Sequence, residues 1–205
     1  MIGRRSVAFR IPLAATALLL ALAGCATAPP QAGRETDWQR HQSLLNELHE
    51  WRVSGRIAIR HEHEGWNASL QWRQNGDEYV LRLSAPLGRG TVELTGSDAG
   101  VSMRTADNRL LHADTPELLM QENLGWQVPL RGLSYWVRGL PEPGSKPEDM
   151  SFDVEGRVQE LRQNGWRVSY ERYLSEGAYE LPGKMMLENR ELRVRLVISD
   201  WIIPA

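Results

Sequence analysis

The stretch Trp51–Arg60, WRVSGRIAIR, alternates between apolar and polar residues with a period of two. Val53, Gly55, Ile57 and Ile59 share one face, whereas arginines and serine make up most of the other. Successive side chains of a β-strand point to opposite faces of its sheet. The stretch therefore predicts a strand of an antiparallel sheet that has one buried face and one face in water.

The same alternation continues on both sides of this strand, with turn residues between the segments. It is clearest from Trp66 to Trp72 and from Leu192 to Ile198, and the pair Asn164-Gly165 is typical of a tight turn. Weaker strand patterns cover residues 79–83, 91–95, 101–103, 152–154, 158–163, 166–170 and 185–188. Such closely spaced strands predict an all-β barrel or sandwich of about ten or eleven strands.

Three segments depart from the β pattern and predict helices. The first is expected to begin at a cap, Thr36 or Asp37, and has apolar residues at spacings of three and four. The second begins with Pro116 just after a capping residue and ends at Gly125. The third covers residues 130–138. The fold class is therefore mainly β, of the α+β type, with about three helices.

The N-terminal residues have the pattern of a secretory signal. Arginines precede the apolar run Ile11–Ala23, which is shorter than the roughly 20 residues that cross a bilayer. The run leads into Leu22-Ala23-Gly24-Cys25, which resembles a lipobox, and Cys25 is the only cysteine. We expect cleavage of residues 1–24 and attachment of diacylglycerol and an N-linked acyl chain to Cys25. Ala26 follows instead of the aspartate that retains such proteins in the inner membrane, which indicates the periplasmic face of the outer membrane.

The mature chain is expected to be an anchor followed by one domain. Residues 25–35 lack apolar periodicity and predict a flexible tether, and residues 36–205 have the length of a single domain. Residues 1–24 contain three arginines and no acidic residue, so their removal changes the formal net charge from −2 to −5. A mildly acidic domain of this kind is not expected to bind nucleic acid.

The sequence offers little for catalysis or metal binding. Gly96–Gly100 contains a serine, but a nucleophile elbow requires it at the third position of a strand-to-helix turn, and a β-turn is expected here. His61 and His63 would share a strand face, yet no further ligand follows at a recognisable spacing. We therefore expect neither an enzyme nor a metal site, and no cofactor apart from the acyl groups on Cys25.

Two features admit more than one interpretation. Pro86 and Gly88 force the chain out of the ladder between two expected strands and leave Leu87 at the turn, either exposed or folded back on the core. The apolar strand faces either fill a compact core or line a cavity for an apolar ligand. Periodicity does not distinguish between these alternatives.

A set of short motifs in a fixed order resembles the LolB family, the outer-membrane receptors that accept lipoproteins from the periplasmic carrier LolA. The motifs run from about residue 37 to the end of the chain. They are Trp51–Arg60; Leu70-Gln71-Trp72; Ala85–Gly88 with Val92-Glu93-Leu94; Val128-Pro129-Leu130 with Leu133, Trp136 and Gly139-Leu140-Pro141; Asn164–Tyr170; Leu181-Pro182; and Asp200-Trp201-Ile202. The resemblance implies a curved antiparallel half-barrel whose helices cap an apolar cavity.

The resemblance also implies a function and its partners. The chain would accept acylated lipoproteins from the carrier LolA and insert them into the outer membrane. Its partners would be LolA, the acylated lipoprotein cargo and the lipid of the outer membrane, and the chain would act as a monomer. Leu87, between Pro86 and Gly88, matches a loop leucine that the family needs for delivery into the membrane. The residues expected to line the acyl-binding cavity are Ile57, Ile59, Leu70, Trp72, Leu81, Leu83, Val92, Leu94, Met103 and Trp136.

A second hypothesis keeps the anchor and the fold but assigns another role. A structural or assembly-factor lipoprotein would bind a protein partner through its sheet and would not transfer lipid. This hypothesis predicts a packed interior, whereas the receptor hypothesis requires an open apolar space inside the sheet.

Overall fold

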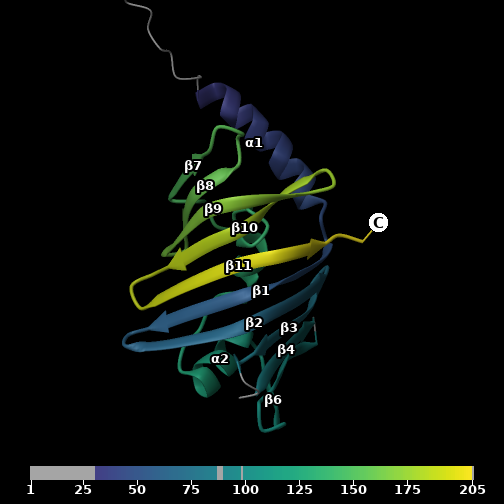
Figure 1. Cartoon of the computed structure of the whole chain (residues 1–205), viewed down its shortest axis with the longest axis vertical. Helices are drawn as coiled ribbons and strands as arrows, with labels where there is room; N and C mark the ends of the chain where they lie inside the picture. The colour runs from purple at the N-terminus through teal and green to yellow at the C-terminus, as the bar shows by residue number, and fades with distance from the viewer. Residues whose placement is uncertain (1–30, 87–89, 98, 205) are drawn as a thin grey trace, which may run out of the picture. The chain divides into compact units, whose positions relative to one another are not determined.

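The computed structural model describes residues 31–86, 90–97 and 99–204, with side chains from residue 37 onward. The strands form one sheet in the order β6-β5-β4-β3-β2-β1-β11-β10-β9-β8-β7, and every neighbouring pair is antiparallel (Figure 1). They are β1 (Glu50–His61), β2 (Glu64–Asn75), β3 (Glu78–Ser84), β4 (Thr91–Ser97), β5 (Gly100–Arg104), β6 (Leu110–Ala113), β7 (Asp149–Phe152), β8 (Val158–Gln163), β9 (Trp166–Glu176), β10 (Tyr179–Glu188) and β11 (Leu192–Ile202). With three helices, this confirms the expected mainly β fold.

Strand β1 lies at the centre of the sheet, between β2 and β11. The alternation read from its sequence is present, because Val53, Ile57 and Ile59 are buried while the strand's three arginines are exposed. Gly55 has a specific role: a Cβ atom there would collide with the backbone carbonyl of Val197 at a register shift in the β1–β11 pairing. Only glycine allows the two strands to approach this closely.

The inner face of the sheet carries the centre of the hydrophobic core. Trp51 is completely buried, and its ring lies 5.0 Å from that of Trp72 and 5.5 Å from that of Trp201, measured between ring centroids. These tilted pairs join β2, β1 and β11 side by side, and aromatic pairs at such distances stabilise a core beyond their buried area. Residues 32–205 make up one compact unit with this single core.

The first helix, α1 (Gln31–Asn46), begins before the expected cap at Thr36 or Asp37. The last proline before the helix is Pro30, and residues 31–35 include only one poor helix former, a glycine. The helix therefore extends into the segment that was expected to be a tether. Trp38 of α1 packs on Phe152, with 5.5 Å between ring centroids.

The C-terminal end of α1 is fixed by a buried arginine. Arg138 donates from Nη1 to the carbonyl oxygens of Leu48, at 2.8 Å, and Leu45, at 3.3 Å. Its guanidinium also lies over the ring of Tyr135, and burial lowers the pKa of Arg138. A cation that caps free carbonyl groups at the end of a helix is favourable. The arginine therefore joins α1 to the segment that follows α3.

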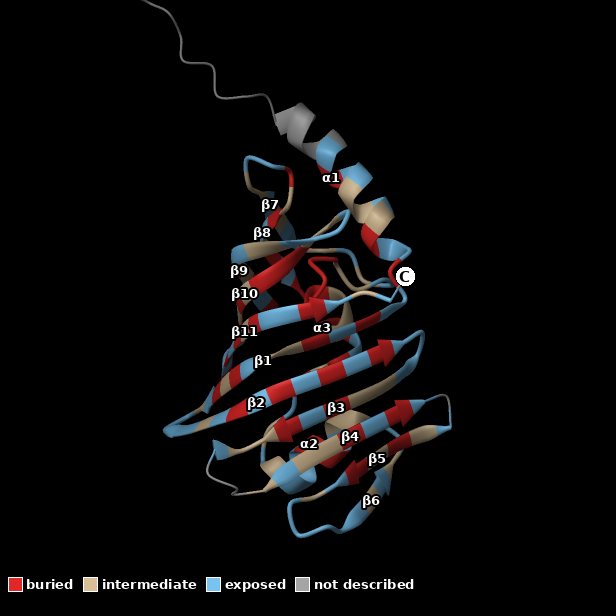
Figure 2. Ribbon diagram, turned by 45° about the vertical axis from the view of Figure 1, so that its right-hand side comes forward, coloured by how far each residue is buried: buried red, intermediate tan, exposed pale blue. Residues whose placement is uncertain are grey.

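The second and third helices are α2 (Pro116–Leu124) and α3 (Leu130–Trp136). The expected ends of α2 are confirmed: the Thr115 hydroxyl accepts a hydrogen bond from the amide of Leu118, and Gly125 adopts a left-handed conformation at φ 78°. In Figure 2 both helices lie behind the strands. Their buried residues are Leu119 and Met120 in α2 and Leu130, Gly132, Leu133 and Trp136 in α3. Among the described helices, none is both long and apolar enough to traverse a membrane.

Some strand boundaries differ from those expected. Strand β7 ends at Phe152 instead of Val154, because the Asp153 carboxylate accepts hydrogen bonds from the amides of Glu155 and Arg157 and forms a turn. Strand β10 begins well before the expected residue 185, since the sheet accommodates Pro182 within the strand through a register shift. Strand β6 was not expected, because its sequence does not alternate.

Candidate functional site

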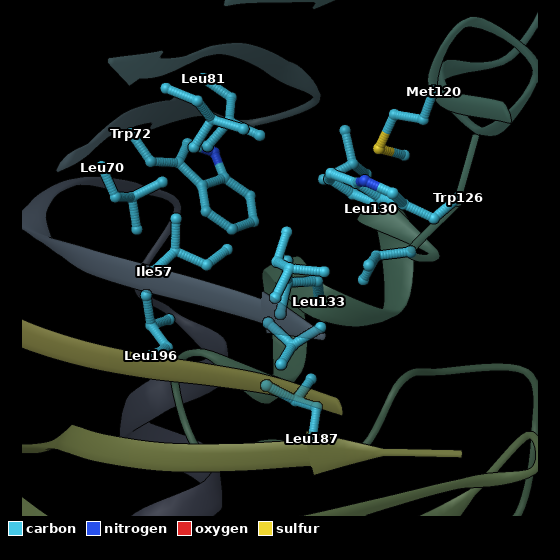
Figure 3. A pocket seen from close by; sticks show the side chains of 14 residues that line it. Ile57, Leu70, Trp72, Leu81, Met120, Trp126, Leu130, Leu133, Leu187 and Leu196 are labelled. Carbon is cyan, nitrogen blue, oxygen red and sulfur yellow. The ribbon is translucent and has the colours of Figure 1, made fainter. Parts of the chain in front are cut away.

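An apolar cavity lies between the inner face of the sheet and the segment from α2 to α3. Figure 3 shows Ile57, Leu70 and Trp72 of the sheet on one side, with Met120 and Leu133 of the helices facing them. The lining residues are all apolar: Ile57, Ile59, Leu70, Trp72, Leu81, Leu83, Met120, Trp126, Val128, Leu130, Leu133, Leu187, Val194 and Leu196. The site therefore offers no partner for a polar ligand group and suits a hydrocarbon.

The structure brings six of the ten residues expected at such a cavity to its wall. They come from the three adjacent strands β1, β2 and β3, as Ile57, Ile59, Leu70, Trp72, Leu81 and Leu83. The other four lie elsewhere in the core. Leu94 and Met103 are completely buried and pair across β4 and β5, while Val92 is half-buried on β4. Trp136, at the end of α3, is completely buried against Trp166.

Eight residues of the wall were not expected from the sequence. Three of them, Leu187, Val194 and Leu196, alternate on β10 and β11 as clearly as the expected residues do. The other five are Met120, Trp126, Val128, Leu130 and Leu133, in α2, α3 and their connection. Their spacing gives no helical stripe, because the apolar residues belong to two short helices with an irregular turn between them. Only the three strand residues could have been found by extending the alternation.

The free space inside the cavity is small in this structure. The volume in which the centre of a water molecule could sit is about 30 Å³, enough for about two waters. A long hydrocarbon chain would need much more space. The space is smaller than the open cavity expected of a receptor, so entry of such a chain would require that the wall move apart.

The two ends of the helical segment are held to the sheet by different kinds of contact. At the end of α3, the Trp136 carbonyl accepts a hydrogen bond of 2.9 Å from the buried Tyr170 hydroxyl. At the connection of α2 to α3, Trp126 packs on Trp66 with 6.1 Å between ring centroids. Between the helices, the Glu117 carboxylate accepts a hydrogen bond of 2.9 Å from the amide of Leu130. Directed bonds thus fix the end of α3, whereas α2 and the connection rest on the sheet through apolar contacts.

The loop between β3 and β4 was expected to carry a membrane-contacting leucine. Pro86 is exposed at its start, and the amide of Ala85 donates to the carbonyl of Gly90 across its base at 3.0 Å. Leu87 and Gly88 lie outside the described residues, as does Cys25. Their roles remain the expectations stated above.

The remaining candidates do not assemble into a chemical site. His61 and His63 lie at the β1–β2 turn, and the Ser97 hydroxyl accepts a hydrogen bond from the amide of Ala99 at the β4–β5 turn. Among the described residues, no group of three or more histidine, cysteine, aspartate or glutamate side chains could hold a metal ion.

Comparison with known proteins agrees with the resemblance of the motifs. The family model described as outer membrane lipoprotein LolB matches residues 49–201. The outer-membrane lipoprotein LolB of Pseudomonas aeruginosa strain LESB58 is 40% identical over 94% of this chain and 95% of its own length. That of Stutzerimonas stutzeri strain A1501 is 40% identical over 92% and 94%.

A solved structure also aligns with the fold. It is a LolA superfamily protein from Nitrosomonas europaea, with a TM-score of 0.49 and 9% identity over 84% of this chain and 94% of that chain. The assignment does not depend on this likeness. It rests on the family model, which spans β1 to β11, and on relatives that match nearly the whole chain at 40% identity. The chain belongs to the outer membrane lipoprotein LolB family.

Proposed function

We propose that the apolar cavity receives the acyl chains of a lipoprotein while that lipoprotein passes from its carrier to the membrane. As a LolB protein, the chain is a non-enzymatic outer-membrane lipoprotein that takes lipoproteins from LolA and inserts them into the outer membrane. The observation that supports the cavity as the binding site is its lining, which consists of fourteen apolar residues from the sheet and from the α2–α3 segment.

The energetics of acyl transfer require such a site. Burial of one methylene group is worth about 0.8 kcal/mol, so a chain of about fifteen methylenes gains roughly 12 kcal/mol on leaving water. A lipoprotein with exposed acyl chains would therefore not cross an aqueous space. A receptor whose cavity binds acyl chains better than the carrier does, but less well than a bilayer, lets transfer proceed without nucleotide hydrolysis.

Loading of the cavity requires α2 and the α2–α3 connection to move away from the sheet. The apolar contacts of Trp126 and Met120 would be replaced by contacts with the acyl chain, so that their loss is offset in the loaded state. The hydrogen bond from Tyr170 to the Trp136 carbonyl stays in place and makes the end of α3 the pivot. This assignment follows from the different contacts at the two ends of the segment.

The proposal gives two further regions a role. Cys25 would carry the acyl groups that anchor the chain, and the loop containing Pro86, Leu87 and Gly88 would enter the inner leaflet of the outer membrane and release the cargo there. We propose that one chain carries out this cycle as a monomer.

A transfer assay with purified components tests the proposed function. A carrier loaded with a labelled lipoprotein is mixed with the acylated chain and liposomes, and the label in the liposomes is followed over time. We expect transfer to depend on the chain and to be competed by a fatty acid that occupies the cavity. Transfer that is unaffected by saturating fatty acid would contradict the role of the cavity. A fluorescent fatty acid that binds without saturation would indicate a filled core, as the assembly-factor hypothesis predicts.

A further inference from the structure

The outer face of the central strands carries a row of arginines, on the side of the sheet turned away from α2 and α3. Figure 2 shows how exposed positions alternate with buried ones along β1, β2 and β11. Six of the exposed positions are arginines, and we call them the arginine row: Arg52, Arg56, Arg60, Arg73, Arg193 and Arg195. In a chain whose formal net charge is −2, this is a local concentration of positive charge.

The row has little compensation from acidic residues. Strands β1, β2 and β11 contain only three carboxylates: Glu50 and Glu64, where β1 and β2 begin, and Asp200, near the end of β11. Among the described side chains, Arg193 is the only member of the row within 4.0 Å of a carboxylate, at 3.2 Å from Glu188. Elsewhere on this face arginines do have partners, as in the pair of Arg82 and Glu93. Five of the six arginines of the row therefore lack a carboxylate of the described residues within 4.0 Å.

The pairing of the strands places like charges directly opposite each other. Arg52 on β1 faces Arg73 on β2, and Arg60 on β1 faces Arg193 on β11. Like charges at directly opposed positions destabilise a sheet. A feature that costs stability without a local compensation is typical of a functional surface.

A depression at one end of the row combines charge with apolar surface. It has a volume of about 370 Å³ and is walled by Arg52, Arg73 and Arg82 together with Val80 and the half-exposed Ile202. The guanidinium group binds phosphate through two parallel N–H donors, which arginine supplies in a fixed geometry. A phosphate joined to a glycerol that carries apolar acyl chains is the chemistry of a phospholipid.

We propose that the arginine row docks this face on the headgroups of anionic phospholipids. A LolB-family lipoprotein is held at the membrane, so the phosphates of the bilayer are always at high effective concentration. Each arginine near an anionic surface strengthens binding about fivefold, and the attraction falls off within about 10 Å at 0.1 M salt. Because the row lies on the face opposite the cavity, the protein can contact lipid there while the cavity remains free to exchange cargo.

Vesicle binding of residues 31–205, which contain the compact unit of residues 32–205, tests the proposal without the anchor. Sedimentation is compared for vesicles of phosphatidylcholine alone and for vesicles that contain phosphatidylglycerol. We expect binding only to the anionic vesicles and loss of binding in high salt. The variant Arg52→Gln/Arg56→Gln/Arg73→Gln should bind about a hundredfold more weakly. Equal binding of both kinds of vesicle would overturn the proposal.

A control with the same net charge separates the row from a general charge effect. Arg40→Gln/Arg109→Gln/Arg162→Gln removes three exposed arginines, each of which is already paired with a carboxylate. We expect this control to bind vesicles as the unaltered domain does, and an equal loss in both variants would contradict the proposal. Thermal unfolding checks folding, since the variant of the row should be at least as stable once the opposed charges are removed. If the row variant binds vesicles normally but loses binding to an acidic protein, the lipid assignment is wrong.

Discussion

Trp136 donates its indole N–H to the side-chain oxygen of Gln163 at 2.9 Å, and both residues are completely buried. The same amide group also holds the loop that follows α3: its oxygen accepts from the Glu142 amide at 2.8 Å, and its nitrogen donates to the carbonyl oxygens of Glu142 and Ser145. One glutamine on β8 thus satisfies the end of α3 and two residues of the loop.

Replacement of this glutamine should therefore destabilise the protein. In Gln163→Leu, the indole N–H and the loop amide and carbonyl groups lose their partner in a buried place, and each group left unpaired costs about 1–3 kcal/mol. We expect a loss of about 2–4 kcal/mol in the free energy of unfolding, measured with urea. Gln159→Leu, at an exposed position of the same strand, is the control and should change stability little. Equal losses in the two variants would show that the buried network contributes nothing.

The tyrosine on β3 that faces Gly96 on β4 makes that glycine necessary. A Cβ atom at Gly96 would collide with the ring of Tyr79, which pairs with it across the strands. Gly96→Ala should lower the free energy of unfolding by about 1–3 kcal/mol, as overpacking does. Truncation of the ring in Tyr79→Ala should abolish most of the further effect of Gly96→Ala. A double-mutant cycle measures this coupling, and strictly additive effects would contradict it.

A bulky side chain in the cavity should prevent acyl binding. Leu133 of α3 lies in the wall, and its replacement by tryptophan would fill the remaining space. We expect Leu133→Trp to weaken the binding of a fluorescent fatty acid by at least about tenfold, while overpacking lowers stability by about 1–3 kcal/mol. Leu118→Trp, on the half-exposed side of α2, should bind the probe normally. Unchanged probe affinity in a folded Leu133→Trp variant would place the acyl site elsewhere.

Delivery into the membrane should depend on the loop leucine. Leu87→Glu introduces a charge that opposes insertion of the loop into hydrocarbon. We expect this variant to accept lipoprotein from the carrier but to stop delivery into liposomes. Val154→Glu makes the same kind of change at a turn residue that is 76% exposed, and it should deliver normally. Delivery by Leu87→Glu at the normal rate would show that the loop has another role.

The docking of α1 should weaken on acidification. Burial lowers the pKa of His41, whose Nε2 lies 3.1 Å from the Glu180 carbonyl. Because the unfolded state then binds a proton more readily than the folded state, stability falls as the pH drops from the ordinary value of 6.5 toward the lowered pKa, and then levels off. Thermal unfolding between pH 8 and pH 5 should show this loss, and His41→Gln should remove it. An identical pH profile in that variant would assign the loss to other groups.

The sheet could be predicted largely from the sequence, because each strand of the centre has one buried face. Val53, Ile57 and Ile59 are buried between positions that are less buried, and the structure places them on the inner face as expected. Strand β10 was the harder case, since Pro182 suggests a break and only tertiary pairing shows that the strand continues through it. Local patterns thus predict strands that have one buried face. They miss a strand such as β10, where the pairing with a neighbouring strand accommodates a proline.

The wall of the cavity was only partly predictable for a different reason. Alternation predicts which strand residues face the inner side of the sheet. It does not predict which of these residues lie opposite α2 and α3 and so line the cavity. Leu94 and Met103 face inward and are completely buried away from the cavity, whereas Leu81, next to Leu94 in the pairing, lines it. The difference depends on where α2 and α3 lie over the sheet. Because both helices are short, the spacing of their apolar residues does not predict that position.

The pairing of β1 with β11 sets the order in which the protein can be completed. The first and last strands of the chain meet at the middle of the sheet, so ten cross-strand residue pairs join sequence positions that are more than 130 residues apart. Contacts of such long range form late and slowly. Until β11 is available, β1 has no partner on one of its two edges. The last strand is therefore the one that joins the two halves of the sheet.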